Sequence, residues 1–195
     1  MIIENINKLR KVSRYIEENE NVEDTIKELF TELSKNSAGN CLSANQIGKF
    51  EQVGVVNVNF PIHFINPKII EKDIPLQVVE SSLSFPNQLF ITKRYGAIVV
   101  KAQNFGKPVY FGIPRNASEF TVESKIVQES IYIQQMIDSM NGKFPIDNKW
   151  TPGQATSEKI YHRNELITII KDKDEKKIKF KRLDFFMNQG WKIKE

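Results

Sequence analysis

The sequence predicts an α+β domain followed by a small basic extension, and three observations lead to this fold class. Apolar residues at helical spacing mark segments near the start and past the middle of the chain, and strand-like apolar runs lie between them. The excess positive charge falls on residues 158–195, where 11 Lys or Arg face 7 Asp or Glu. The length of 195 residues suffices for a domain with a substantial core and an appendage.

Two helices and then a sheet are predicted in the first half of the chain. Apolar residues three and four positions apart predict helices over 4–18, packing on the domain, and over 22–34. The second helix is expected to end near Gly39, a residue suited to a left-handed cap. Extended apolar stretches then predict an antiparallel sheet with strands over 53–58, 64–70, 77–80, 90–92 and 97–102.

A long helix over 121–142 and a separate extension are predicted in the second half. The loop over 148–157 contains Trp-Thr-Pro-Gly and is typical of a linker. Two strands and a short helix, over 166–170, 177–180 and 183–187, make up the extension. The predicted boundaries are therefore 1–147 for the domain, 148–157 for the linker and 158–195 for a basic β-β-α extension.

Composition argues against several classes of protein. A single cysteine excludes an internal disulfide framework and favours a reducing compartment, so we expect a cytoplasmic protein. No stretch approaches the ~18 apolar residues of a membrane span, and the acidic Glu4 does not suit a secretory signal, so no membrane partner is expected. Acids interleave with the lysines of the tail, as in residues 171–177, which argues against nucleic acid as a partner.

Three segments carry a family resemblance. They read Gly-Asn-Cys-Leu-Ser-Ala-Asn-Gln-Ile-Gly over 39–48, Glu-Ser-Ser-Leu-Ser over 80–84 and Gln-Gln-Met-Ile-Asp-Ser-Met-Asn-Gly over 134–142. In this order they resemble the G-x-G-L-A-A-x-Q-I-G, E-G-C-L-S and Q-H-E-x-D-H motifs of the peptide deformylases. The stretch Ile65-Asn-Pro67 and the strand after Arg94 fit the same family. The resemblance covers residues 22–144 and implies a deformylase-like α+β fold.

The resemblance also implies a catalytic metal held by one Cys and two His, with a Glu that moves the proton. Those positions hold Ser82, Gln135 and Ser139, and the Glu position holds Met136. Neutral hydroxyl and carboxamide groups are poor ligands for a transition metal, and a thioether cannot act as a general base. From this we expect a deformylase-like fold without deformylase catalysis, with no catalytic residue, metal or cofactor.

The non-metal half of the implied site is retained. Gln46 and the Leu83 amide match family groups that polarise the formyl oxygen, and Glu80 and Asp138 match residues with structural roles. The former active site would therefore comprise Gln46, Ser82, Leu83, Gln135, Met136 and Ser139. The candidate peptide-binding residues are Gly39, Cys41, Gln46, Leu83 and Ile137.

Other chemistries fit the sequence less well. A nucleophilic Cys41 would need a nearby base, and the two histidines, His63 and His162, lie outside the motifs. Ser82 and Ser84 likewise have no His or Lys in motif register. The tail carries more apolar groups than a free hairpin would, so it is expected to dock on the body or on a protein partner. Its candidate docking residues are Phe180, Phe185, Phe186 and Trp191.

Our first functional expectation is therefore a catalytically inactive, peptide deformylase-like structural or interaction subunit of a larger assembly, with a phage virion component as one candidate. Two alternatives stay open. One is a binder of peptide N-termini that does not hydrolyse them, and the other is a residual peptide deformylase.

Overall fold

The structure is a computed structural model of the chain. It describes residues 2–37, 39–115, 117, 121, 123–148, 166–171, 174–179, 182, 186 and 190–194. The chain forms two compact units, Met1–Gln154 and Ala155–Glu195, each considered by itself. Their boundary falls inside the segment 148–157, whose role as a linker stays a prediction. The first unit has the predicted α+β composition, with antiparallel sheets and a long helix after them.

The N-terminal segment forms one helical turn and then an extended strap, so the predicted helix over residues 4–18 is wrong. Helix α1 spans only Ile6–Leu9. Beyond it the Ser13 amide donates to the Met140 carbonyl at 2.8 Å, and Ile16 is fully buried. Hydrogen bonds from this strap to the rest of the fold thus replace the hydrogen bonds of a helix. The apolar residues have helical spacing only because the extended strap happens to enter the core at those positions.

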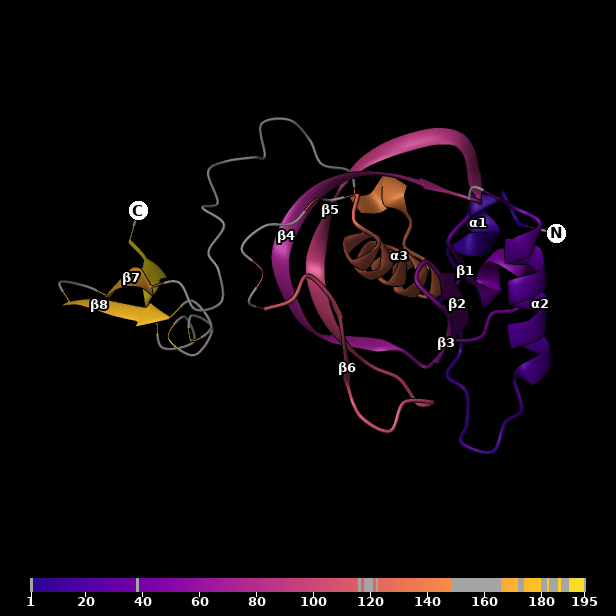
Figure 1. Cartoon of the computed structure of the whole chain (residues 1–195), viewed down its shortest axis with the longest axis horizontal. Coiled ribbons are helices and arrows are strands. Elements are labelled where there is room, and N and C mark those ends of the chain that lie inside the picture. The colour runs from indigo at the N-terminus through magenta and orange to yellow at the C-terminus, as the bar shows by residue number, and fades with distance from the viewer. Residues whose placement is uncertain are drawn as a thin grey trace. The chain divides into compact units, whose positions relative to one another are not determined.

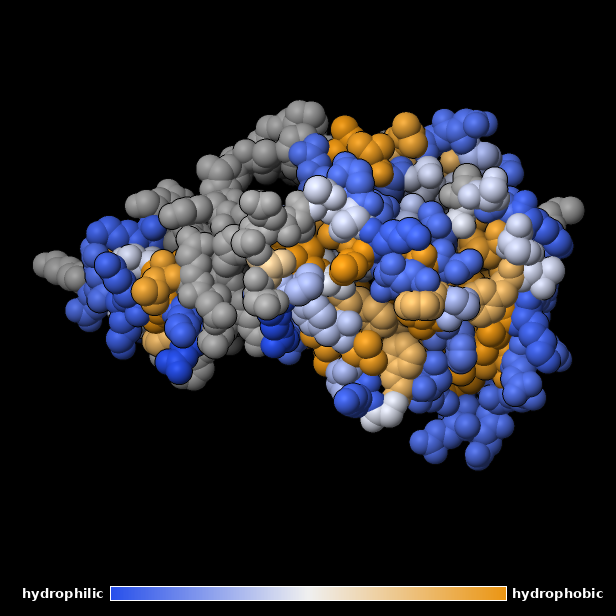
Figure 2. All heavy atoms as spheres, viewed as in Figure 1, coloured by the Kyte–Doolittle hydropathy of each residue, from blue (hydrophilic) through white to orange (hydrophobic). Residues whose placement is uncertain are grey.

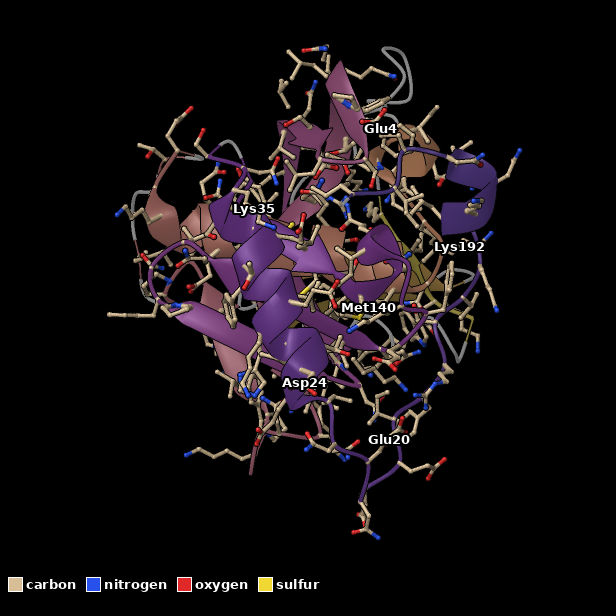
Figure 3. The ribbon with its side chains drawn as sticks, turned by 90° about the vertical axis from the view of Figure 1, so that its right-hand side faces the viewer. Glu4, Glu20, Asp24, Lys35, Met140 and Lys192 are labelled. Atoms are coloured by element: carbon tan, nitrogen blue, oxygen red, sulfur yellow. The ribbon has the colours of Figure 1, made fainter. Side chains whose placement is uncertain are left out.

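Helix α2, Glu23–Ser34, confirms the prediction for this segment. Its buried face carries Leu29 and Leu33, and its outer face is mostly hydrophilic in Figure 2. Figure 3 looks onto α2 from outside, with Asp24 and Lys35 near its two ends and Met140 farther inside. The helix ends at the right-handed cap residue Lys35, not at a left-handed Gly39 as predicted.

A first antiparallel sheet places the opening motif against the core. Its order is β1-β2-β3, with β1 at Cys41–Ser43, β2 at Val53–Asn57 and β3 at Pro61–Ile65. A short 3-10 helix, η1 at Ala44–Ile47, follows β1 directly, so the motif turns away from the sheet there. Strand β2 is rich in Val and β3 contains two Ile, and β2 is buried over most of its length.

A second antiparallel sheet contains the second motif. Its order is β4-β5-β6, with β4 at Lys68–Ser82, β5 at Phe85–Lys101 and β6 at Val109–Gly112. The predicted strands over 77–80, 90–92 and 97–102 are parts of these two long strands. The predicted strand over 64–70 is divided at Asn66, whose φ of 49° is left-handed, so the chain passes from one sheet to the other.

Helix α3, Lys125–Met140, is the centre of the unit. Figure 1 shows it inside the curve of β4 and β5, with β1, β2 and α2 beyond its other side. It contacts both sheets, which is why it is buried on nearly all faces. Such a helix fixes the third motif against the first two. A short turn, η2 at Pro145–Asn148, follows it. No helix among the described residues is long and apolar enough to cross a bilayer.

The second unit contains the predicted hairpin and one further strand. Strand β7, Leu166–Lys171, pairs with β8, Asp174–Lys179, and with β9, Lys192–Ile193. The third strand was not predicted, and the predicted helix over 183–187 lies mostly outside the described residues. Phe186 and Trp191 pack on the unit's own apolar cluster of Ile167, Ile169 and Ile178. Phe180, Phe185 and His162 lie outside the described residues.

Candidate functional site

The three motifs meet where α3 crosses β1, η1 and the end of β4. Ser139 on α3 lies with its Oγ 2.6 Å from Ser43 Oγ on β1 and 3.1 Å from Asn45 Oδ1 in η1. Asn45 Nδ2 donates in return to the Ser139 carbonyl at 2.7 Å. These three side chains are almost completely buried. The first and third motifs are thus joined by direct contacts between neutral polar groups.

Gln46 is held in one orientation by its neighbours. Ser43 and Gln46 form a capping box around η1, in which Gln46 Oε1 accepts from the Ser43 amide at 3.1 Å and from Ser43 Oγ at 3.0 Å. On the other side, Gln46 Nε2 donates to Ser84 Oγ at 3.0 Å. A carboxamide carries two N–H donors, and one of those of Gln46 has no partner among the described residues.

Gln135 joins α3 to the second motif, and Cys41 contacts it from β1. Gln135 Nε2 donates to the Ser81 carbonyl at 2.6 Å, and Cys41 Sγ lies 3.8 Å from Gln135 Oε1. Burial of the sulfur raises the pKa of Cys41 to about 12, and the negative charge of Glu80 adds to this rise. The thiol is therefore protonated at neutral pH and is not an activated nucleophile.

The carboxylates of Glu80 and Asp138, both in the motifs, pair with the same arginine, Arg94. Arg94 on β5 donates from Nη2 to Glu80 Oε1 at 2.8 Å and from Nε to both Glu80 oxygens. Its Nη1 pairs with Asp138 of α3. Arg94 and Glu80 are nearly fully buried, while Asp138 is partly exposed. This triad ties β4, β5 and α3 together, which is a structural role for both carboxylates.

Met136 belongs to the apolar core. It is fully buried, in a cluster with Phe64, Ile133 and Met140. A Cβ added to Gly54 on β2 would lie 2.6 Å from Met136 Sδ and 2.5 Å from Met140 Cε. The absence of a side chain at Gly54 therefore lets β2 approach the two methionines closely.

The other predicted site residues lie around this centre. Ser82 and Leu83 are half-buried at the end of β4, where Ser82 Oγ accepts from the Ser84 amide at 3.3 Å. Gly39 packs against Leu83 and is also half-buried. Ile137 is 7% exposed and packs in the core. Histidine His63 lies on β3 and is not among the partners of Cys41.

Two residues of the site were missed by sequence reasoning. Ser43 and Asn45 connect Gln46 to Ser139, and neither was singled out. For Ser43 a signal was available, because Ser-x-x-Gln is the pattern of a capping box. Asn45 had no such signal, since its contact with Ser139 joins positions 94 residues apart.

Comparison with known proteins identifies the family of this fold and site. The profile described as polypeptide deformylase matches residues 3–153. The chain therefore belongs to the polypeptide deformylase family. It is 27% identical to peptide deformylase 1 of Vibrio vulnificus over 144 residues, which cover 72% of this chain and 79% of that one. It is 34% identical to peptide deformylase 2 of Clostridium acetobutylicum over 101 residues, 49% of this chain and 65% of that one.

The solved structures agree with the sequence relatives. The crystal structure of peptide deformylase from Thermotoga maritima is similar with a TM-score of 0.58 at 26% identity, over 73% of this chain and 91% of that chain. The fold expected from the resemblance is thus confirmed in its coarse form, a deformylase fold with antiparallel sheets and a helix that carries the third motif.

The same comparisons correct the functional expectation. We predicted an inactive structural or interaction subunit, a virion component among the candidates, and a protein that is not an enzyme. The matching family and the relatives are peptide deformylases, which are enzymes, and none of those named above is a structural or virion protein. That prediction is wrong. The prediction treated the substitutions at Ser82, Gln135, Met136 and Ser139 as proof of a new role. Substitutions at these positions do not by themselves establish a new role.

The residues present do not fit the metal that the family resemblance implies. Ser82, Gln135 and Ser139 offer neutral oxygen and nitrogen atoms, and each of these side chains already takes part in a hydrogen bond. Transition-metal sites in proteins are built from thiolate, imidazole and carboxylate groups. Among the described residues no group of three or more His, Cys, Asp or Glu could hold an ion. The side chains at the three ligand positions are therefore unsuited to a transition metal.

Proposed function

We propose that the chain recognises the N-terminal end of a polypeptide, as a divergent peptide deformylase. Ser82, Gln135 and Ser139 occupy the positions of the family's Cys, His and His metal ligands, and Met136 occupies the position of its Glu. Membership of the polypeptide deformylase family supports the substrate class. The lone thiol, Cys41, supports a reducing compartment such as the cytoplasm.

The observation that carries this proposal is the fixed carboxamide of Gln46. Its two partners, Ser43 and Ser84, set its orientation and leave one N–H donor for a ligand carbonyl. Leu83 lies at the adjoining end of β4, half-buried, where its backbone amide would be the second donor. A fixed donor loses little conformational entropy on binding, so it favours a ligand of matching geometry.

The nearby residues suit the side chain and backbone of a peptide terminus. Gly39 and Leu83 are half-buried and present small or apolar groups, and Cys41 lies beside them with its sulfur buried against Gln135. Ile137 lies beneath, in the core, and would act through packing. A formylated methionine offers a carbonyl oxygen for Gln46 and an apolar side chain for Gly39 and Leu83, which are the two features that the residues match.

The test is a binding titration with a formyl-methionyl tripeptide and its unformylated form, with formate measured in the same samples. We expect saturable binding, about tenfold weaker in Gln46→Glu, because that change removes the N–H donors. Gln77→Glu is the matched control, the same substitution at an exposed position of β4, and should bind as the wild type does. Undetectable binding of both peptides at millimolar concentration would sink the proposal. Formate in the samples would show that hydrolysis accompanies binding.

A further inference from the structure

One face of helix α3 is joined to β1, η1 and β4 at two positions one turn apart. Gln135 and Ser139 lie on the same helix face because they are four residues apart. Gln135 Nε2 donates to the Ser81 carbonyl of β4 at 2.6 Å. Ser139 Oγ contacts Ser43 Oγ of β1 at 2.6 Å and Asn45 Oδ1 of η1 at 3.1 Å. The face of α3 that carries the ligand positions of the motif is thus fastened to β1, η1 and β4.

The polar atoms of this cluster satisfy one another. Ser43 Oγ can donate to Gln46 Oε1 while Ser139 Oγ donates to Asn45 Oδ1, so both hydroxyl protons have acceptors. Asn45 Nδ2 donates to the carbonyls of Ser139 and Leu9, at 2.7 and 3.3 Å. Ser43 Oγ also lies 2.6 Å from Asn45 Oδ1. A cation on Ser139 Oγ would turn the Ser139 proton away from Asn45 Oδ1, and the single hydroxyl proton of Ser43 could then serve either Asn45 Oδ1 or Gln46 Oε1 but not both. Losing a buried hydrogen bond of this cluster is unfavourable.

Among the described residues, the carboxylates beside this face of α3 already have a cationic partner. Glu80 and Asp138 are both paired with Arg94. Cys41 is the one thiol of the chain, and its Sγ lies 3.8 Å from Gln135 Oε1. A metal would have to displace the guanidinium of Arg94 before gaining a carboxylate ligand from Glu80 or Asp138.

We infer that the chain folds and holds this site together without a metal ion. Hydrogen bonds between α3 and Ser43, Asn45 and Ser81 stand where coordination bonds would otherwise join the motifs. The inference rests on the donor atoms and their partners alone. It does not depend on the peptide-binding proposal, and it would stand if that proposal failed.

The first test uses the full-length wild-type protein, purified from cells grown with added iron, nickel and zinc. We expect well under one equivalent of each metal by elemental mass spectrometry after dialysis. The melting temperature should differ by less than about 1 °C between EDTA and added Co²⁺, since a ligand stabilises a fold only when it binds the native state. One equivalent of retained metal, or a melting temperature that EDTA lowers by several degrees, would overturn the inference.

A variant that rebuilds the donor set provides the comparison. The triple substitution S82C/Q135H/S139H replaces the neutral groups with a thiol and two imidazoles, and S82C alone is its matched control. We expect thiolate-to-Co²⁺ absorption bands and Co²⁺ binding at least about tenfold tighter in the triple variant than in the wild type or the control. Equal binding by the wild type would contradict the inference. Should the triple variant fail to fold, the wild-type metal content still decides.

Discussion

The Oγ atoms of Ser43 and Ser139 lie 2.6 Å apart, and this contact joins the first and third motifs of the family across the core. Ser139 stands where the resemblance places a metal-binding histidine, and its partner comes from the strand that leads into Gln46. The small polar side chains of Ser43 and Ser139 therefore have two structural roles. They fasten α3 to β1, and through Ser43 they orient the carboxamide that we propose meets a peptide.

Removing one hydroxyl of this pair should weaken the fold. In Ser139→Ala, Asn45 Oδ1 and Ser43 Oγ lose a buried partner, so we expect a loss of about 1–2 kcal/mol in the free energy of unfolding, measured with urea. Ser34→Ala changes an exposed hydroxyl on α2 and should cost less than about 0.5 kcal/mol. The double variant with Ser43→Ala should lose less than the sum of the two single losses. Strict additivity would show that the two hydroxyls do not interact.

The Arg94 triad should be among the most sensitive features of the fold. Arg94→Met leaves Glu80 buried without its partner, and breaking such a pair typically costs about 3–5 kcal/mol. Arg10→Met removes the same group from an exposed pair with Asp147 and should cost far less. Chemical denaturation of both variants makes the comparison. Equal losses in the free energy of unfolding would mean that the buried triad stabilises the fold no more than the exposed pair does.

Stability should fall at alkaline pH because of Cys41. Its folded pKa is raised to about 12, so the folded state keeps the thiol proton while the unfolded chain loses it above about pH 8.5. The contribution of the Cys41 thiol to the free energy of unfolding is therefore complete below about pH 8.5. Above that pH it declines by roughly 1.4 kcal/mol per pH unit. Tyr132, whose pKa is also raised by burial, acts in the same direction at higher pH.

The check for Cys41 compares wild type and Cys41→Ala by urea unfolding at pH 7.0 and 9.5. The wild type should lose roughly 1–2 kcal/mol more than the variant over this interval. The thiol should also react with iodoacetamide about 10³-fold more slowly than a free cysteine at pH 8, because so little thiolate is present. Rapid alkylation of the folded protein would show that the sulfur is exposed to solvent.

A glycine at the end of the third motif should resist substitution. Gly142 has a φ of 70°, and an added Cβ would press on the Arg10 backbone of the N-terminal strap. Gly142→Ala combines a left-handed conformation with overpacking, so we expect a loss of about 2–4 kcal/mol in thermal or urea unfolding. Gly106→Ala meets no atom within 4 Å and should be nearly neutral. A neutral Gly142→Ala would mean that the strap moves aside at no cost.

Sequence reasoning worked best where local pattern and tertiary packing agree. Helices α2 and α3 follow from the spacing of Leu29, Leu33, Val127 and Ile131, because the same apolar face that defines the helix is the one buried. The motif order placed Gln46, Gln135 and Ser139 together. The structure joins Gln46 to Ser139 through Ser43 and Asn45, while Gln135 contacts Cys41 and Ser81.

The rest of the fold depends on long-range contacts that no local pattern carries. The N-terminal strap follows a helical spacing, yet its backbone hydrogen bonds go to Met140 and Phe50. The division of the strands at Asn66 depends on a left-handed residue that also bonds to Ile16 in that strap. The functional prediction was wrong. The absence of the family's metal ligands shows which groups the site lacks, but it does not show what the site binds.

The most direct test of a peptide site in this chain is an NMR titration of ¹⁵N-labelled wild-type protein with a formyl-methionyl tripeptide in the presence of EDTA. We expect saturable shift changes at Gln46, Leu83 and Ser84, with little change at the exposed strand positions Gln77 and Lys93. Shift changes that cluster elsewhere, or that appear only when a divalent metal is supplied, would contradict a peptide site that works without metal.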